Sequence, residues 1–287
     1  MSATDTISIV INTDTRPGYM EKESVQGKQF EGTRSLDYFT DGVLNKANFF
    51  RGFKLQVILF VDVHEPLDKQ VEDTLHEWHK EGKIDVLVLH RNNKTFPGFD
   101  YFPCYNDLNY LNALMFSRGK YVVHFDGDMA GFCKDSSVIT DWINLLDTGV
   151  YDYISYPTPW SPKPDEDPRW DYSWVSTRFF MCKRSSLDYT EIQKCLVDPD
   201  YMYAKYGDKY HRCPWFEHVL GIMAGPDKVF YPAYDLQKYF VFSWSYYHSG
   251  NYEKLNRIPY EKVLEYVFAC GGIRYPCDVY GTRLILK

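Results

Sequence analysis

The regular alternation of apolar runs with helical stretches in the first 130 residues is the feature that most constrains the fold. Runs rich in β-branched residues separated by helices indicate strands whose two faces are both covered, which is typical of parallel sheets. Crossover helices then connect neighbouring strands with a right-handed turn. The sequence therefore predicts an α/β fold with a mostly parallel sheet flanked by helices. The strands are expected at 7–11, 55–63, 84–89 and 121–125, and the helices near 33–51, near 66–81 and in a third stretch that ends near Arg118.

Two of these helices show an apolar face at helical spacing. The residues on these faces are Leu67, Val71, Leu75 and Trp78 in one helix, and Leu108, Leu111 and Met115 in the other.

The pattern loosens after residue 130, and no repeat or linker divides the chain. We therefore expect one domain, with a first half at about 1–130, a second half at about 131–235 and an aromatic, irregular C-terminal extension at about 236–287. The later elements are expected as a helix at 137–147, strands at 151–156 and 174–181, a helix from Pro214 to Ala224 and a short helix near 259–269.

Composition excludes some classes of function. The 287 residues carry 32 Lys+Arg against 39 Asp+Glu, a net charge of −7, which disfavours a nucleic-acid binder. No run is long enough to cross a membrane, and the seven cysteines contain no CxxC pair, so we expect a cytoplasmic protein, soluble or peripheral to a membrane. Aromatic residues make up 18% of the chain; they either stack on sugars and bases or fill an aromatic core.

Polar residues follow each of the four apolar runs. Because the carboxyl ends of parallel strands meet at one edge of a sheet, these groups are expected to lie together where such folds bind ligands. The four segments are Asn12–Pro17, Asp62–Pro66, His90–Asn93 and Asp126–Met129.

The last of these segments contains the most specific motif, Asp126-Gly127-Asp128. Two carboxylates separated by one small residue can face a single point and supply the hard oxygen ligands that Mn²⁺ or Mg²⁺ prefers. A metal held there can neutralise charge on a diphosphate leaving group. A D-x-D at a surface turn is the ordinary alternative, but the buried run before it favours a metal site.

Together these segments resemble the GT-A fold nucleotide-sugar glycosyltransferases, and most of all the inverting enzymes of glycosyltransferase family 2. The resemblance covers about residues 5–225. Its matching pieces are the segment Thr13 to Pro17, the strand ending at Asp62, the stretch Asn109 to Asp128 (NYLNALMFSRGKYVVHFDGD) and Trp215 to His218.

The resemblance implies a donor site on the first half of the chain. Thr13, Asp14 and Arg16 would line the nucleoside pocket, and Asp62 would hydrogen-bond the base or the ribose of a UDP-sugar or GDP-sugar. Asp126 would reach the ribose or the metal.

The resemblance also implies which residues bind the metal and which one acts as the base. Asp128 would be the firmest metal ligand, and Glu217 would be the general base that deprotonates an acceptor hydroxyl. Several GT-A enzymes complete the metal shell with a C-terminal histidine, for which His248 is the best candidate and His211 the next. His248 could equally be a packed or surface side chain.

Two positions depart from the family pattern. The family has an asparagine eight residues before the glycine at 119, where this chain has Leu111 between Asn109 and Asn112. The family commonly has Glu-Asp near the base, where this chain has Glu217-His218. His218 either orients the acceptor or packs within its helix.

An aromatic cluster and a Pro-rich loop fall where the family meets its acceptor. The rings can stack on a sugar face while the charged residues bind its hydroxyls, or the loop can be an ordinary surface excursion. The residues are Trp160, Trp170, Tyr172, Trp174 and Trp215, with Asp165, Glu166, Asp167 and Arg169 in the loop.

The sequence thus predicts a metal-dependent glycosyltransferase that inverts the anomeric carbon and acts on a glycan or a small hydroxyl acceptor. Retaining enzymes share the D-x-D motif, and a non-catalytic sugar-nucleotide-binding protein is the alternative from another class. A haloacid-dehalogenase phosphatase is disfavoured because no Thr or Val follows Asp128, and a sugar nucleotidyltransferase because Asn12–Gly18 contains only one glycine. A membrane-inserted polymerase is disfavoured because the sequence contains no run long enough to span a membrane. Neither the donor sugar nor the oligomeric state follows from these residues.

Overall fold

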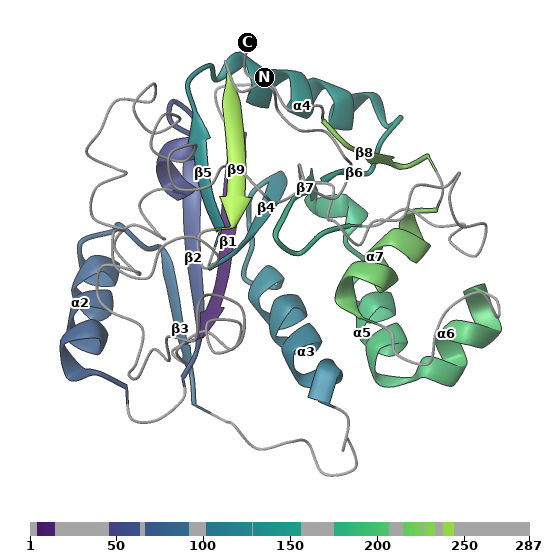
Figure 1. Cartoon of the computed structure of the whole chain (residues 1–287), viewed down its shortest axis with the longest axis horizontal. Helices are drawn as coiled ribbons and strands as arrows, with labels where there is room; N and C mark the ends of the chain where they lie inside the picture. The colour runs from purple at the N-terminus through teal and green to yellow at the C-terminus, as the bar shows by residue number, and fades with distance from the viewer. Residues whose placement is uncertain are drawn as a thin grey trace, which may run out of the picture.

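A seven-stranded mixed sheet forms the centre of the computed structural model of the chain (Figure 1). Its strands follow the order β3-β2-β1-β4-β7-β6-β8, and four of the six pairings are parallel. β5 and β9 form a separate antiparallel pair. The structure describes residues 5–14, 46–63, 67–91, 102–127, 129–155, 175–206, 215–225, 227–232 and 238–243.

One strand of the main sheet runs opposite to the others. β1 to β4 run parallel to one another, β7 is antiparallel to both of its neighbours, β4 and β6, and β8 is parallel to β6. The strands are β1 (Thr6–Asp14), β2 (Lys54–Asp62), β3 (Val86–His90), β4 (Tyr121–Asp126), β5 (Met129–Cys133), β6 (Tyr153–Ser155), β7 (Phe179–Lys183), β8 (Val229–Phe230) and β9 (Tyr239–Ser243).

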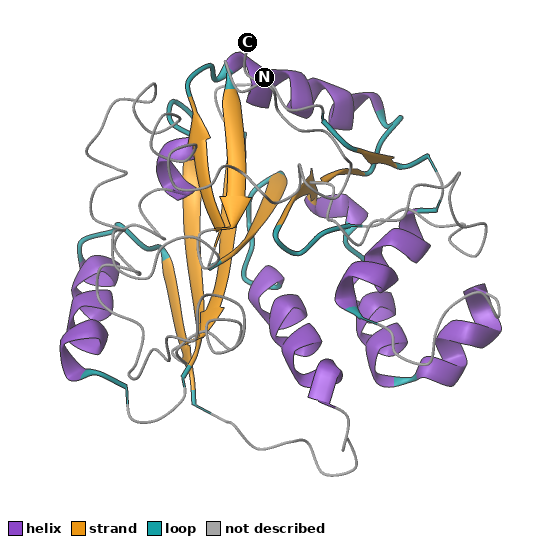
Figure 2. Cartoon of the chain, in the orientation of Figure 1, coloured by secondary structure: helices purple, strands orange, loops and turns teal. Residues whose placement is uncertain are grey.

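Helices cover both faces of the sheet (Figure 2). One face packs against α2 and α4, and the other against α3, α5, α6 and α7. The helices are α2 (Lys69–Lys80), α3 (Phe102–Leu114), α4 (Ser137–Thr148), α5 (Tyr189–Val197), α6 (Pro199–Tyr206) and α7 (Phe216–Ala224), with a 3-10 turn η2 (Arg184–Ser186) after β7.

Alternation along the strands explains the two cores. Val57, Leu59 and Val61 of β2 enter the core beneath α2 and α4, whereas Ile58 and Phe60 enter the opposite core. Successive side chains of a strand point to opposite faces, so a strand covered on both sides is apolar throughout. The α/β architecture with a mostly parallel sheet flanked by helices is thereby confirmed.

Many of the described aromatic residues belong to the core. Phe49, Phe125, Trp142 and Phe179 form a cluster with ring centroids 4.9–6.3 Å apart. All four side chains are at most 3% exposed. For these residues the interpretation as an aromatic core holds.

Several predicted bounds need correction. α2 begins only at Lys69, because the Asp68 carboxylate caps it by accepting hydrogen bonds from the main-chain N–H groups of Gln70 and Val71. α3 ends at Leu114, so Met115 lies beyond the helix and is 59% exposed rather than part of the apolar face.

In the second half of the chain, the predicted bounds differ more from those in the structure. The strand predicted from residue 174 begins at Phe179, and the helix predicted from Pro214 begins at Phe216. Residues 239–243, expected to be irregular, form β9 by pairing with β5, a long-range contact that local pattern does not encode. The helix expected near 259–269 and most of the one near 33–51 lie outside the described residues.

Gly119 sets the start of β4 against β1. Its N–H donates to Ser8 Oγ at 2.7 Å, and a Cβ added at Gly119 would lie 2.5 Å from the carbonyl oxygen of Thr6. Only glycine permits this approach of two main chains. The register that results pairs Ile7 with Tyr121 and carries forward to the other end of both strands.

Candidate active site

The carboxyl ends of four parallel strands lie in a row at one edge of the sheet. Strand pairing places His90 of β3 beside Asp62 of β2, Asp62 beside Asp14 of β1, and Asn12 of β1 beside Asp126 of β4. The expectation that the polar strand ends meet at one edge is confirmed for these residues. We call this row the donor edge.

The donor edge contains some of the predicted nucleoside residues. Asp62 is 6% exposed, and its Oδ1 lies 3.3 Å from Nδ1 of His90, which orients both side chains. Thr13 is partly exposed, and Asp14 is placed by its main chain alone. Arg16 lies outside the described residues.

Three hydrogen bonds to main-chain groups hold the turn after β4. The N–H of Gly127 donates to the carbonyl oxygen of Asn12 at 2.6 Å, and the Asp126 N–H donates to the carbonyl oxygen of Arg178 at 3.3 Å. The ammonium of Lys46, a fully buried side chain, donates to the Gly127 carbonyl oxygen at 3.0 Å. Asp126 is therefore held at the donor edge by its backbone, with its side chain partly exposed.

One carboxylate of the predicted metal site is described. Asp126 supplies the type of hard oxygen ligand that Mg²⁺ and Mn²⁺ prefer, from a turn that is already held in place. Asp128 and His248 lie outside the described residues, as does His211. Across the described ranges no three metal-ligating side chains converge. Asp126 thus fits a metal ligand, and the rest of the shell stays a prediction.

The predicted base, Glu217, lies in the first turn of α7 and is bound by Thr177. Its Oε1 accepts a hydrogen bond from the Thr177 main-chain N–H at 2.7 Å and another from the Thr177 hydroxyl at 3.0 Å. The same hydroxyl lies 3.5 Å from Oδ2 of Asp126. One side chain therefore bridges the predicted base and the donor edge, although the two carboxylates are far apart in sequence.

Burial raises the pKa of Glu217 above its ordinary value of 4.5, while the hydrogen bonds from Thr177 and the charge of Arg178 oppose the rise. The residue as a whole remains partly exposed. A carboxylate with a raised pKa is the kind of group that can accept a proton near neutral pH.

Two further residues of this pocket, Asp107 and Tyr110 of α3, were not singled out from the sequence. Asp107 Oδ1 accepts the main-chain N–H of Phe216 at 2.9 Å, so it caps α7 from another helix. Burial raises the pKa of Asp107 to about 7; the bond from Phe216 opposes this and the charge of Glu217 adds to it. The only local signal, an acidic residue in a helix, is too common to have identified it.

Tyr110 completes the pocket. Burial raises its pKa well above the ordinary value of 10.0, and the nearby carboxylates of Asp126, Glu217 and Asp107 add to this effect. The side chain of Thr177 opposes this rise. We call Asp107, Tyr110, Thr177 and Glu217 the base pocket.

His124 connects the donor edge to the base pocket beneath the surface. Its Nδ1 hydrogen-bonds the carbonyl oxygen of Thr177, and its Nε2 lies 3.0 Å from Oδ1 of Asn12. Burial lowers the pKa of this fully buried histidine to about 3, which favours a neutral ring whose single N–H, on Nδ1, donates to Thr177. Asn12 in turn donates to the carbonyl oxygen of Asn109 at 3.2 Å.

The two asparagines near Leu111 differ in position. Asn109 is 7% exposed and faces the sheet, whereas Asn112 is exposed on the outer side of α3. Only Asn109 therefore lies next to the donor edge, through its main-chain contact with Asn12.

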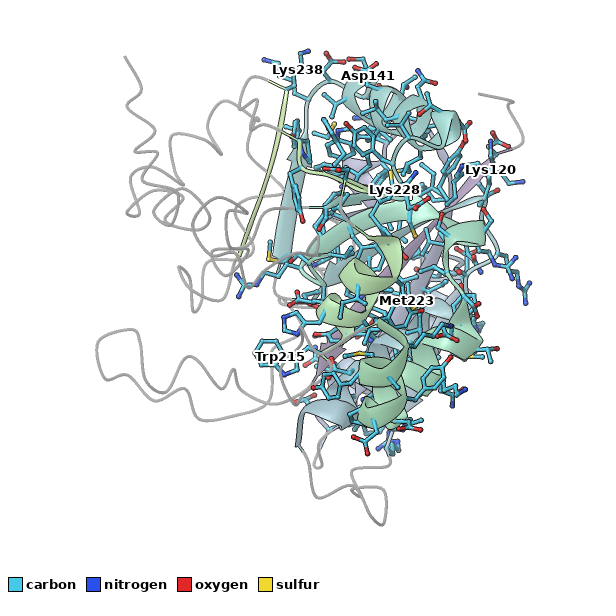
Figure 3. All side chains as sticks on the ribbon, turned by 90° about the vertical axis from the view of Figure 1, so that its right-hand side faces the viewer. Lys120, Asp141, Trp215, Met223, Lys228 and Lys238 are labelled. Atoms are coloured by element: carbon cyan, nitrogen blue, oxygen red, sulfur yellow. The ribbon has the colours of Figure 1, made fainter. Side chains whose placement is uncertain are left out.

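Trp215 is the described member of the predicted acceptor cluster. It immediately precedes α7, is 46% exposed, and stacks on His218 with ring centroids 5.1 Å apart and planes 7° from parallel (Figure 3). His218 is 8% exposed, and its ring packs against that of Trp215. The other members, from Trp160 to Trp174, and the loop containing Asp165 to Arg169 lie outside the described residues.

Comparisons with known proteins place the chain among distant neighbours. No family model and no curated protein matches it. Three solved structures illustrate the likeness. The mannosyltransferase PcManGT from Pyrobaculum calidifontis, in complex with GDP-Man and Mn²⁺, is 12% identical with a TM-score of 0.38, over 64% of this chain and 46% of that one. The chain thus spans less than half of that protein.

The other two structures match over more of their length. The galactosyltransferase LgtC, in complex with donor and acceptor sugar analogues, is 11% identical with a TM-score of 0.46, over 78% of this chain and 72% of that one. A cytidylyltransferase from Leptospira borgpetersenii is 14% identical with a TM-score of 0.40, over 98% and 99%. Likenesses this distant concern the fold and say nothing about substrate or mechanism.

Within the described part of the chain, no helix is both long and apolar enough to span a bilayer.

Proposed function

We propose that this protein is a metal-dependent glycosyltransferase that moves a sugar from a nucleotide-diphosphate donor to an acceptor hydroxyl, with inversion. One observation carries the proposal. The Thr177 hydroxyl lies 3.0 Å from Glu217 Oε1 and 3.5 Å from Asp126 Oδ2, so a carboxylate suited to proton transfer stands one side chain away from the donor edge. Transfer of a sugar to a hydroxyl needs a base beside a donor site.

In the proposed reaction, Glu217 accepts the proton of the acceptor hydroxyl as that oxygen bonds to the anomeric carbon. The bond from this carbon to the diphosphate oxygen breaks, and the diphosphate leaves with the electron pair. Because the base and the leaving group lie on opposite faces of the sugar, the anomeric configuration inverts. The raised pKa of Glu217 suits it to hold the proton during this step.

The donor would bind across the donor edge. Asp62, oriented by His90, is proposed to hydrogen-bond the base or the ribose, with Thr13, Asp14 and Arg16 around the nucleoside. Asp126, Asp128 and His248 are proposed to hold Mn²⁺ or Mg²⁺. When bound, such a cation neutralises negative charge on the leaving diphosphate.

The acceptor is proposed to be a glycan or a small molecule with a sugar-like face. Trp215 lies two residues before Glu217, and its ring is held by stacking on His218. An exposed, oriented indole is a surface on which the C–H face of a sugar can stack. Residues of about 131–235 would then bind the acceptor, and residues of about 1–130 the donor.

Thermal unfolding in the presence of UDP, GDP, CDP and dTDP, each with and without Mn²⁺, tests the proposal. A ligand that binds only the folded state raises the melting temperature by mass action. We expect one of these nucleotides to raise the melting temperature in a manner that depends on Mn²⁺.

The matched variants are Asp126→Asn and Asp141→Asn. Both remove one carboxylate charge, but Asp141 is exposed on the outer side of α4 (Figure 3). The Mn²⁺-dependent part of the shift is expected to vanish in Asp126→Asn and to persist in Asp141→Asn. No shift with any of these nucleotides would count against a nucleotide-sugar donor and would favour a protein that binds none, such as a phosphatase. A product with the configuration of the donor would establish a retaining enzyme.

A further inference from the structure

The segment between residues 175 and 178 brings a single threonine to the junction of the two candidate sites. Thr177 is 7% exposed and contributes both of its donors, the main-chain N–H and the hydroxyl, to one oxygen of Glu217. A hydroxyl carries only one hydrogen. At 3.0 Å from Glu217 and 3.5 Å from Asp126, that hydrogen is best placed on Glu217.

Thr177 is itself held firmly in place. Its carbonyl oxygen accepts a hydrogen bond from the fully buried ring of His124. The preceding residue, Ser176, donates its N–H to the Ser155 hydroxyl at 2.8 Å. The segment is therefore fixed through bonds at two consecutive residues, and it can define where the carboxylate lies.

The charged and polar groups around Glu217 come from several elements. α3 contributes Asp107 and Tyr110, the end of β4 contributes Asp126, and the segment before β7 contributes Ser176, Thr177 and Arg178. Within its own helix the adjacent titratable side chain is His218, which stacks on Trp215. Asp107, Asp126 and Glu217 carry the same charge when ionised. Repulsion between ionised carboxylates opposes a position of Glu217 next to the donor edge, and hydrogen bonds to its carboxylate offset this repulsion.

We propose that Thr177 is the positioning residue of this site, which holds the Glu217 carboxylate beside Asp126 and ready for the acceptor hydroxyl. The proposal rests on the proposed function for the role of Glu217. It adds a residue whose side chain has no place in the proton transfer itself. A hydrogen bond to an ionised carboxylate is stronger than one between neutral groups, so the hydroxyl adds appreciably to the bond from the main-chain N–H.

Replacing the hydroxyl without changing the shape of the side chain tests this directly. Thr177→Val removes the donor and keeps the volume, Thr177→Ser keeps the donor, and Thr140→Val makes the same change at an exposed position of α4. The ionisation midpoint of Glu217 is followed by ¹³C NMR of the labelled glutamate carboxyl carbons. The Glu217 resonance is identified as the one that is missing from the spectrum of Glu217→Gln.

We expect Thr177→Val to raise this midpoint by roughly one pH unit, because a hydrogen bond that favours the ionised form is lost. Thr177→Ser and Thr140→Val are expected to keep the midpoint of the original protein. In transfer assays with the sugar donor of the nucleotide found above, Thr177→Val is expected to lower kcat by on the order of 10- to 100-fold. The KM for the donor is expected to stay within about twofold, and Thr177→Ser to restore kcat.

An unchanged midpoint and an unchanged kcat in Thr177→Val would overturn the proposal, as would failure of Thr177→Ser to restore either. The proposed function fails by a different result, which is continued transfer by Glu217→Gln. The NMR midpoint needs no substrate, so in that event it would still decide whether Thr177 holds the carboxylate.

Discussion

The donor edge and the base pocket are adjacent but are built in different ways. At the donor edge, Asp62, Asn12 and Asp126 stand at the ends of neighbouring strands, and the main-chain ladder of the sheet sets their spacing. In the base pocket, Thr177 and Glu217 come from a loop and a helix, and side-chain hydrogen bonds set their spacing.

This difference determines how each region responds to change. A ladder of main-chain bonds keeps its geometry when one side chain is altered, whereas a pocket joined by two or three side-chain bonds does not. In the base pocket, burial also raises the pKa values of Asp107 and Glu217. We therefore expect single substitutions there to change chemistry, and substitutions in the sheet to change stability.

The largest effect is expected from Glu217→Gln. The amide keeps the size of the side chain but cannot accept the proton, so kcat should fall by about 10²- to 10⁴-fold. Binding of the nucleotide with Mn²⁺, measured by thermal shift, should remain because it belongs to the donor edge.

The control is Glu77→Gln on the exposed side of α2, which is expected to retain full transfer. Loss of nucleotide binding in Glu217→Gln would show that the two regions are not separable and would reassign Glu217 to the donor site.

The dependence of transfer on pH is the next largest effect. Glu217 must be ionised to act as a base, so activity is lost as the pH falls through its pKa, by about tenfold per pH unit. Because burial raises that pKa, the midpoint of the acid limb of kcat should lie above 4.5. A rate profile between pH 4 and pH 9 checks this, and an acid limb centred at or below 4.5 would contradict the buried environment described for this carboxylate.

Gly119→Ala tests the frame of the donor edge. The added Cβ would lie 2.5 Å from the Thr6 carbonyl oxygen, so the main chains of β1 and β4 would have to separate. We expect a loss of about 1–3 kcal/mol in the free energy of unfolding, measured with urea. Gly82→Ala is the comparison, since open space surrounds Gly82 and only its φ of 75° opposes a side chain. A smaller loss at Gly119 than at Gly82 would mean that the contact does not set the register.

Asp107→Asn should produce the smallest effect, and one that depends on pH. The pKa of Asp107 is raised to about 7 in the folded protein from 3.8, so the folded state binds more protons than the unfolded state between these values. Stability due to this group therefore falls as the pH rises from about 4 to about 7. Asparagine keeps an acceptor for the Phe216 N–H and never ionises.

Relative to the original protein, Asp107→Asn should gain on the order of 1 kcal/mol or more in free energy of unfolding between pH 5 and pH 8. Urea unfolding at both pH values measures this gain, and Asp141→Asn on the outside of α4 should show none. Equal differences at the two pH values would mean that Asp107 is ionised in the folded protein throughout.

Much of the donor edge could be predicted from sequence because its signals are local. The apolar runs that form β1, β2, β3 and β4 end in polar residues, and parallel pairing alone brings those ends together. Glu217 was found through a resemblance of motif rather than through periodicity. The predicted bounds of helices and strands after residue 130 agree less well with the structure, because β7 and β9 depend on antiparallel partners that are distant in the sequence.

The residues around Glu217 could not be found in this way. The sequence places Thr177 in a strand, and it gives no signal that separates Asp107, Tyr110 and His124 from other residues of a helix or a strand. Only the folded structure brings these side chains into contact. Their roles arise from contacts between segments that no spacing in the sequence relates.

The sequence by itself determined the α/β class, the edge at which polar strand ends meet, and the acidic turn at Asp126, since periodicity and strand direction are local properties. Only the tertiary structure decided that Thr177 spans Glu217 and Asp126, that Asp107 caps α7, and that burial raises the pKa values of both carboxyl groups in the base pocket. Hydrogen-bond partners and desolvation depend on which distant segments pack together, and that is a property of the folded chain.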